Sequence, residues 1–140
     1  MEKTLKVLFK APYKDCEVKE IPNDFKVIKD LIKCQTVESL TIPNKKQRYC
    51  ILMDEDGKFK QLAGNFFIPE FQDCVVGNCV FVSYDKNGNF KSLSETQIKD
   101  IQKYTKYFGL NEGEDLYGDD KAHLIARAIK RYDRLRGEEL

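Results

Sequence analysis

The sequence predicts an α+β fold, with a small mixed or mainly antiparallel β-sheet, two packed helices and a C-terminal amphipathic helix. Three observations predict it. Residues 48–84 consist largely of β-branched and aromatic runs separated by turn residues, which is typical of strands. Segments 24–33 and 94–108 repeat apolar residues at helical spacing. After Gly109 the composition changes to an acidic stretch followed by a basic one.

The first elements follow from local patterns. Residues 4–10 alternate between apolar and polar, which predicts a strand that is half-buried or at the sheet edge. Residues 16–21 alternate in the same way and predict a second strand. Asn23 or Asp24 then caps a short helix over 24–33, and a strand over 36–42 follows it.

The middle of the chain predicts further strands. An apolar run over 49–53 predicts a strand that ends at the turn residues 54–57. The pattern leaves undecided whether residues 59–62 form a further short strand. Residues 75–84 read as one continuous strand that stops at an Asn-Gly turn. Ser94 and Gln97 have the spacing of a capping box, which predicts the start of the second helix.

The last third of the chain divides by charge. Residues 111–120 hold five carboxylates and no base, whereas residues 121–136 hold six bases and one acid. We therefore expect a core domain over 1–109, an acidic linker over 110–120 and a basic amphipathic helix over 121–140.

The predicted C-terminal helix carries two candidate contact surfaces. One is a basic face that could meet phosphates or an acidic partner, made of Arg127, Lys130, Arg131 and Arg134. A solvated face tethered to the chain's own acidic linker is the alternative. The other is an apolar seam made of Ile125, Ile129, Tyr132 and Leu135. Either the chain's own domain or a second copy of the chain must cover this seam, so a homodimer is one of two expectations.

The motifs for familiar catalysis are missing from the sequence. Cys74 and Cys79 are expected on opposite faces of a regular strand, and His123 is the single histidine, so we predict no metal site, no catalytic set and no cofactor. Phosphate-loop glycine motifs are absent as well. Four positions are expected to serve as turns or points of close backbone approach: Gly64, Asn65, Gly77 and Glu38.

Bulk properties point to a cytoplasmic protein. The chain has 140 residues, which is long enough for one compact core. Its formal net charge of +1 is too small to attract the whole molecule to nucleic acid. No apolar run approaches the roughly 20 residues that span a bilayer, so we expect no membrane contact. Five irregularly spaced cysteines are expected to be reduced.

Several runs resemble a known family. They are Glu17-x-x-x-Ile21-x-Asn23-Asp24, Val37-Glu38, residues 50–58 (CILMDEDGK), Gly64-Asn65, residues 73–82 (DCVVGNCVFV), Gly88 and residues 92–94 (SLS). Over about residues 4–101 the chain resembles the domain-of-unknown-function family numbered 3846, which is found in phages and mobile elements, mostly of Firmicutes. Cys34-Gln35 departs from the Gly-Gly turn expected after the first helix, and the acidic and basic segments lie outside the resemblance.

The resemblance implies a setting more than a chemistry. We expect a phage or mobile-element accessory protein in the host cytosol that binds a host protein stoichiometrically and inhibits a defence system. A nucleotide-binding sponge or weak nucleic-acid-binding protein is the first alternative. The second is an enzyme with an unusual site, which would need a deep pocket joining Asn65, Asp73 or Glu38 to a titratable group.

Overall fold

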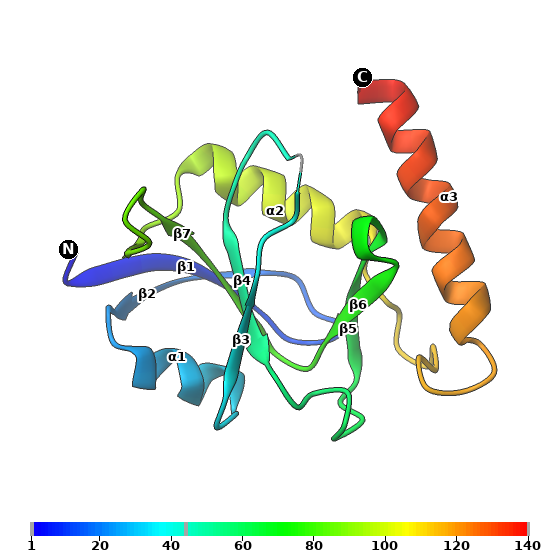
Figure 1. Ribbon diagram of the computed structural model, residues 1–140, viewed down its shortest axis with the longest axis horizontal. Coiled ribbons are helices and arrows are strands. Elements are labelled where there is room, and N and C mark those ends of the chain that lie inside the picture. The colour runs from blue at the N-terminus through cyan, green and yellow to red at the C-terminus, as the bar shows by residue number, and fades with distance from the viewer. Residues whose placement is uncertain (1, 44, 140) are drawn as a thin grey trace.

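A computed structural model describes residues 2–43 and 45–139, and it has a mainly antiparallel α+β fold, as the sequence predicts (Figure 1). The strands are β1 (Thr4–Lys10), β2 (Glu17–Pro22), β3 (Val37–Leu40), β4 (Cys50–Asp54), β5 (Gly64–Ile68), β6 (Asp73–Val76), β7 (Cys79–Tyr84) and β8 (Phe90–Lys91). The helices are α1 (Phe25–Ile32), the 3-10 helix η1 (Pro69–Phe71), α2 (Glu95–Tyr107) and α3 (Lys121–Glu139).

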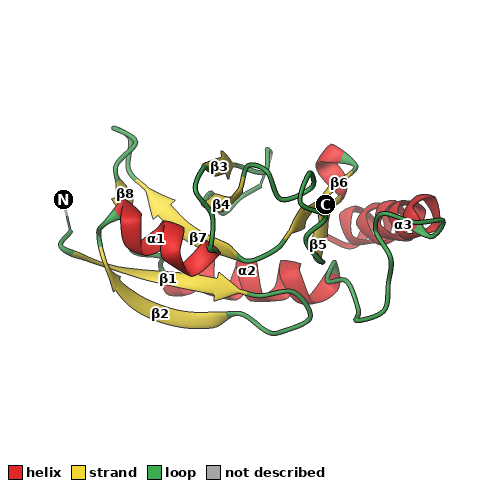
Figure 2. Ribbon diagram, turned by 90° about the horizontal axis from the view of Figure 1, so that it is seen from below, coloured by secondary structure: helices red, strands yellow, loops and turns green. Residues whose placement is uncertain are grey.

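The main sheet has the strand order β2-β1-β7-β4-β3, and β8 pairs with β7 beyond this path. Each pair of neighbours is antiparallel. Helix α1 covers one face of the sheet and α2 covers the other (Figure 2). Strands β5 and β6 form a separate two-stranded sheet beside the α2 face.

Two apolar cores lie on the two faces of the main sheet. Residues of alternate parity along a strand point to opposite faces, so Leu5 and Val7 of β1 pack with Ile28 of α1, whereas Leu8 packs on the α2 side. The prediction that β1 lies half-buried or at the edge was therefore wrong. Strand β1 lies between β2 and β7, and the edge position belongs to β2.

The predicted run 75–84 is not one strand. Gly77 has a φ of 72°, and the chain turns there, so β6 pairs in the small sheet and β7 in the main one. An added Cβ at Gly77 would lie 2.7 Å from Leu62 Cδ1, which makes this a point of close approach. Cys74 and Cys79 consequently lie in the same core, and the expectation of opposite faces was wrong because it assumed a regular strand.

Local signals at the helix ends are confirmed. The Asp24 side chain accepts from Lys26 N at 2.9 Å and caps α1. Ser94 and Gln97 form the predicted capping box at the start of α2. Residues 58–61, by contrast, form turns and not the short strand left open by the sequence.

The acidic segment 110–120 packs against the core. Leu110 and Leu116 are buried, and the Tyr117 hydroxyl donates to Leu62 O at 2.6 Å. Helix α3 continues from it and packs against η1 and β5 (Figure 1). The description of this segment as a linker is therefore corrected, because its two leucines belong to the same apolar cluster as β5 and α2.

Candidate functional site

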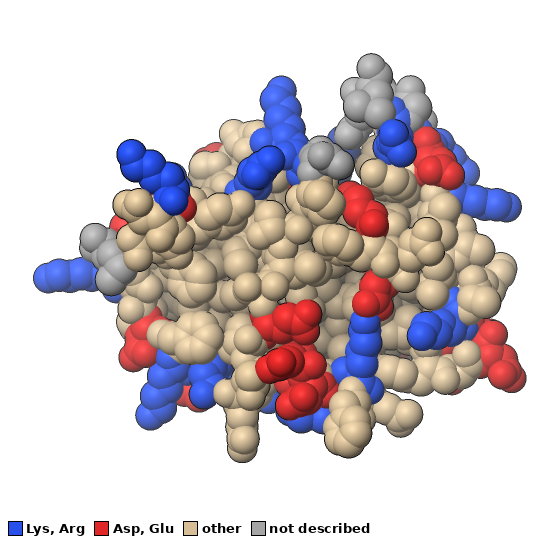
Figure 3. All heavy atoms as spheres, in the orientation of Figure 1, with Lys and Arg blue, Asp and Glu red and all other residues tan. Residues whose placement is uncertain are grey.

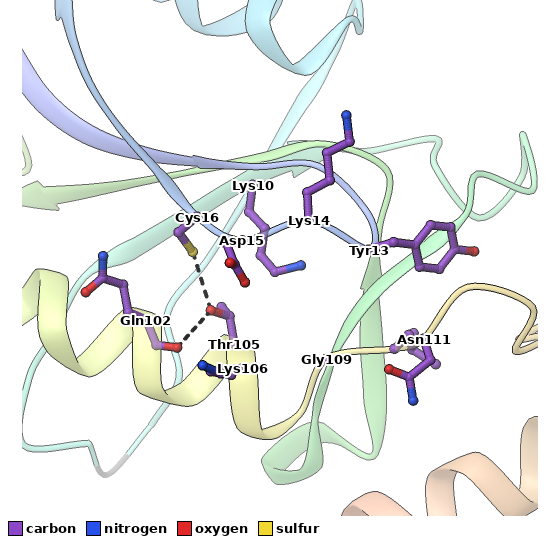
Figure 4. Close-up of a pocket in the computed structure, with 11 residues that line it drawn as sticks. Lys10, Tyr13, Lys14, Asp15, Cys16, Gln102, Thr105, Lys106, Gly109 and Asn111 are labelled. Carbon is purple, nitrogen blue, oxygen red and sulfur yellow. Dashed lines mark hydrogen bonds between the residues drawn. The ribbon is translucent and has the colours of Figure 1, made fainter.

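A polar cleft of about 490 Å³ opens on the α2 side of the molecule (Figure 4). It lies between the loop joining β1 to β2, the C-terminal half of α2 and the segment that follows α2. Its lining residues are Lys10, Tyr13, Lys14, Asp15, Cys16, Gln102, Thr105, Lys106, Gly109, Leu110 and Asn111. We call it the Lys10 cleft, because that side chain is its most unusual component.

Lys10 is a buried amine. It is the last residue of β1 and shares the parity of Leu8, so the strand directs it to the α2 side, where it is only 5% exposed. Its Nζ donates to Asn65 Oδ1 at 2.6 Å and more weakly to Ala11 O at 3.4 Å. Burial lowers the pKa of Lys10 below its usual 10.5, because removal from water disfavours the charged form.

The fully buried amide of Asn65 holds this amine in place. Asn65 Nδ2 donates to Lys10 O at 3.0 Å and to Gly77 O at 2.8 Å, while Oδ1 accepts from Lys10 Nζ. One side chain from β5 thus joins the end of β1 to the turn between β6 and β7. Because an amide is neutral, it orients the Lys10 ammonium without compensating its charge.

None of the ion pairs among residues 2–43 and 45–139 involves Lys10. The two nearby thiols do not supply the missing charge. Burial raises the pKa of both Cys16 and Cys79 above the usual 9, so each is neutral near pH 7. Asp15 is exposed and lines the cleft, where its charge acts on Lys10, and the cleft also holds two further lysines, Lys14 and Lys106. The cleft therefore carries an excess of positive charge.

Hydrogen-bonding groups complete the wall on the α2 side. Thr105 Oγ1 donates to Ile101 O at 2.8 Å. It also lies 3.4 Å from Cys16 Sγ and from Gln102 O (Figure 4). Gln102 and Asn111 add side-chain amides to the lining. The arrangement can attract an anion, orient it by hydrogen bonds and partly desolvate it. These are the properties of a site for a small charged molecule.

The basic face predicted on α3 lies away from this cleft and is partly used within the chain. Arg127 forms an ion pair with Glu114 at 2.7 Å, and Arg131 Nη1 donates to Tyr107 O at 3.1 Å. Lys130 and Arg134 are exposed. The alternative of a face tethered to the chain's own acidic segment thus describes Arg127.

The predicted apolar seam of α3 packs largely on its own domain. Ile125, Tyr132 and Leu135 are partly buried against the α2-side core, and Leu124 and Ala128 of the same helix are fully within it. Ile129 is half-buried. A second copy of the chain is therefore not needed to cover this face.

The four predicted turn or close-approach positions separate into two places. Gly64, Asn65 and Gly77 lie next to residues of the Lys10 cleft without lining it: Asn65 binds Lys10 and Gly77, and a Cβ at Gly64 would overlap Leu110. Glu38 instead lies on β3, beside Asp73, at a second and smaller cavity. The pocket expected for an enzyme would join Asn65, Asp73 or Glu38 to a titratable group; Glu38 and Asp73 both line the smaller cavity, whereas Asn65 lines neither of the two.

Lys10 itself was missed from the sequence. The side chains of Lys10 and Leu8 point to the same face of β1, which could have indicated that Lys10 is buried. However, β1 is buried on both faces only because it lies between β2 and β7, and the sequence did not predict that position. Thr105 of α2, which is 3% exposed, also lines the cleft and was not singled out as a site residue.

Two further observations concern other kinds of site. In the described part of the chain, no three His, Cys, Asp or Glu side chains gather in a way that could hold a metal ion. No helix within residues 2–43 and 45–139 has the length and apolar character to cross a membrane.

Comparison with known proteins gives one finding. No curated protein and no solved structure matches the chain. A family model described as "Domain of unknown function (DUF3846)" matches residues 5–109, which include Lys10, Asn65, Gly77 and Thr105. The match ends before the acidic segment and α3. By this match, and in agreement with the resemblance of its sequence, the chain belongs to the DUF3846 family.

Proposed function

We propose that this protein captures a small phosphate-bearing molecule, of the nucleotide class, in the Lys10 cleft. The observation that carries the proposal is the buried Lys10 ammonium, which has a neutral hydrogen-bond acceptor and no ion pair among the described residues. Buried charges in proteins are normally paired, because leaving one unpaired is costly. An anionic ligand would supply the missing partner.

The geometry suits a phosphate group in particular. An ammonium has three donors, and the stronger of the two protein contacts of Lys10 goes to Asn65. A phosphate oxygen in the cleft would accept from the remaining donor and form a charge-assisted hydrogen bond. Lys14 and Lys106 line the same cleft and would meet further phosphate charge. The volume of about 490 Å³ is in the range of known small-molecule sites.

The cleft favours capture of a small phosphate compound over the two other hypotheses from the sequence, which are binding of a host protein and an enzyme with an unusual site. Two of the four residues in the predicted basic face of α3 already bind groups of this chain, which weakens the case for that helix as the main contact surface. The groups that line the cleft include three amines, two amides, two hydroxyls, a neutral thiol and the carboxylate of Asp15, and the excess of amines favours recognition of an anion. Stoichiometric binding in the cytoplasm of a host cell, by a phage or mobile-element accessory protein, is the role we propose for it.

A binding experiment tests this proposal. Protein purified from the host is denatured, and released small molecules are identified by mass spectrometry; ATP and pyrophosphate are then titrated into the refolded or ligand-free protein by calorimetry. We expect saturable binding that weakens at least roughly tenfold in Lys10→Met, since truncating one member of a buried charge contact costs about 2–5 kcal/mol. Lys26→Met, at an exposed position on the α1 face, is the matched control and should bind normally.

Two results would overturn the proposal. One is equal affinity of Lys10→Met and the unchanged protein for every phosphate compound that binds. The other is an affinity that rises with the length of a single-stranded oligonucleotide and falls steeply with salt, which would indicate nucleic acid bound along an extended surface.

A further inference from the structure

A second cavity, of about 150 Å³, lies on a different part of the surface, between the outer strand β3 and the small β5–β6 sheet. Its apolar lining comes from both sheets and includes Leu40, Met53, Ile68, Phe71 and Val76. Phe71 is 43% exposed and forms part of the wall at the end of η1. The cavity is small enough to hold one long side chain, not a cofactor.

The rim of this cavity is acidic. Four carboxylates and one lysine line it: Glu38, Asp54, Glu55, Asp73 and Lys58. Figure 3 shows acidic side chains grouped on the face where β3 lies. This cavity therefore differs in charge from the Lys10 cleft.

Two of the four carboxylates are already used within the chain. Asp54 pairs with Lys60 Nζ at 2.7 Å, and Asp73 pairs with Lys58. Glu38 and Glu55 are both exposed and take part in none of the ion pairs among residues 2–43 and 45–139. They lie on β3 and immediately after β4, so a cation between them would also lie over the apolar lining.

Strand β3 also has a free edge beside the cavity. Among the described residues it pairs with β4 alone, through the register from Val37 opposite Asp54 to Leu40 opposite Ile51. An edge strand presents unpaired main-chain groups that an extended peptide can join. The cavity and the edge are contiguous, because Glu38 and Leu40 belong to both.

We propose that this cavity docks an extended segment of a partner protein through an arginine side chain. The three methylenes of the arginine lie on the apolar lining formed by Leu40, Met53 and Phe71, and its guanidinium meets Glu38 and Glu55. The flanking main chain of the segment adds to the edge of β3. Charge complementarity selects this occupant, since an apolar side chain would leave the two carboxylates unpaired and an acidic one would be repelled.

The methionine count of the chain makes a direct test feasible. Met53 lines the cavity, and the chain has only one other methionine, Met1, so ¹³C-methyl labelling of methionine gives a simple spectrum. The probes are acetyl-Val-Arg-Val-amide and the same peptide with citrulline, which keeps the shape of arginine but is neutral. We expect the arginine peptide to shift the Met53 methyl resonance saturably, with roughly fivefold weaker binding for citrulline.

Variants separate charge from shape. Glu38→Gln with Glu55→Gln should weaken the arginine peptide by roughly fivefold, the size expected of exposed charge pairs. Glu20→Gln with Glu112→Gln removes the same charge at exposed positions, one of them on the opposite edge strand β2, and should leave binding unchanged. Thermal unfolding checks that each variant folds. Equal binding of the two peptides, an unmoved Met53 resonance, or full binding by the Glu38/Glu55 variant would each overturn the proposal.

Discussion

The side-chain amide of Asn65 makes four hydrogen bonds where β1, β5 and the turn before β7 meet, the longest of them to Cys79 Sγ at 3.8 Å. Two others satisfy main-chain carbonyls of Lys10 and Gly77, and another orients the Lys10 amine. Because the residue is completely buried, water cannot replace these bonds when the amide is removed. The Lys10 cleft thus depends on a side chain that does not itself line it.

Replacing Asn65 with Ala should destabilise the protein by about 2–4 kcal/mol, because several buried polar groups lose their partners. Urea unfolding followed by circular dichroism measures the change. Asn78→Ala is the matched control: that half-buried amide makes one long bond, 3.4 Å to Leu31 O, and its loss should cost less than about 1 kcal/mol. Similar losses for the two variants would contradict the role given to Asn65.

At the scale of elements, local signals predicted more than composition did. The capping box at Ser94 and the cap at Asp24 act within a few residues, and both are confirmed. The acidic composition of 110–120 predicted a linker, yet Leu110 and Leu116 attach this segment to the core. The two buried leucines attach the segment to the core although most of the acids around them remain exposed, and the ion pair of Glu114 with Arg127 adds to the attachment.

Helix α3 should contribute to stability through the face that meets its own domain. Leu124→Ala is expected to cost about 2–4 kcal/mol, since this side chain is 3% exposed and lies in the α2-side core. Ile129→Ala, on the same helix but half-buried, should cost less than about 1.5 kcal/mol. Unfolding in urea with a single transition gives both values. If Leu124→Ala changes nothing and the protein sediments as a dimer, the seam serves self-association instead.

For the molecule as a whole, the sequence predicted the fold class and most elements but not the site. Strand and helix periodicities are local, whereas the burial of Lys10 depends on β7 and α2, which come about 70 and 85 residues later. The break at Gly77 also depends on tertiary contacts, because Leu62 and Asn65 both pack against the turn. Asn65 was identified as a position of interest from its neighbour Gly64, without any indication of its hydrogen bonds.

The coupling of charge and burial at Lys10 predicts how ligand affinity depends on pH. Burial places the pKa of the free Lys10 below 10.5, and a bound phosphate raises it by stabilising the ammonium. Affinity for ATP should therefore fall as pH rises through the lowered pKa, and binding at such pH values should take up as much as one proton. The phosphates of ATP are fully ionised well above about pH 6, so they do not titrate in this range.

The unliganded protein should show the opposite trend in stability. Between the lowered pKa of Lys10 and 10.5, the unfolded chain binds more protons than the folded one, so the free energy of unfolding rises with pH. The difference between the unchanged protein and Lys10→Met isolates this effect from the other groups facing the amine, which are Cys16, Cys79 and Asp15.

Calorimetry in buffers of different ionisation enthalpy measures the proton uptake on ATP binding, and Lys10→Arg, which stays charged, should show none. Affinity that is independent of pH in the unchanged protein would mean that Lys10 does not meet the ligand, even if the cleft binds one.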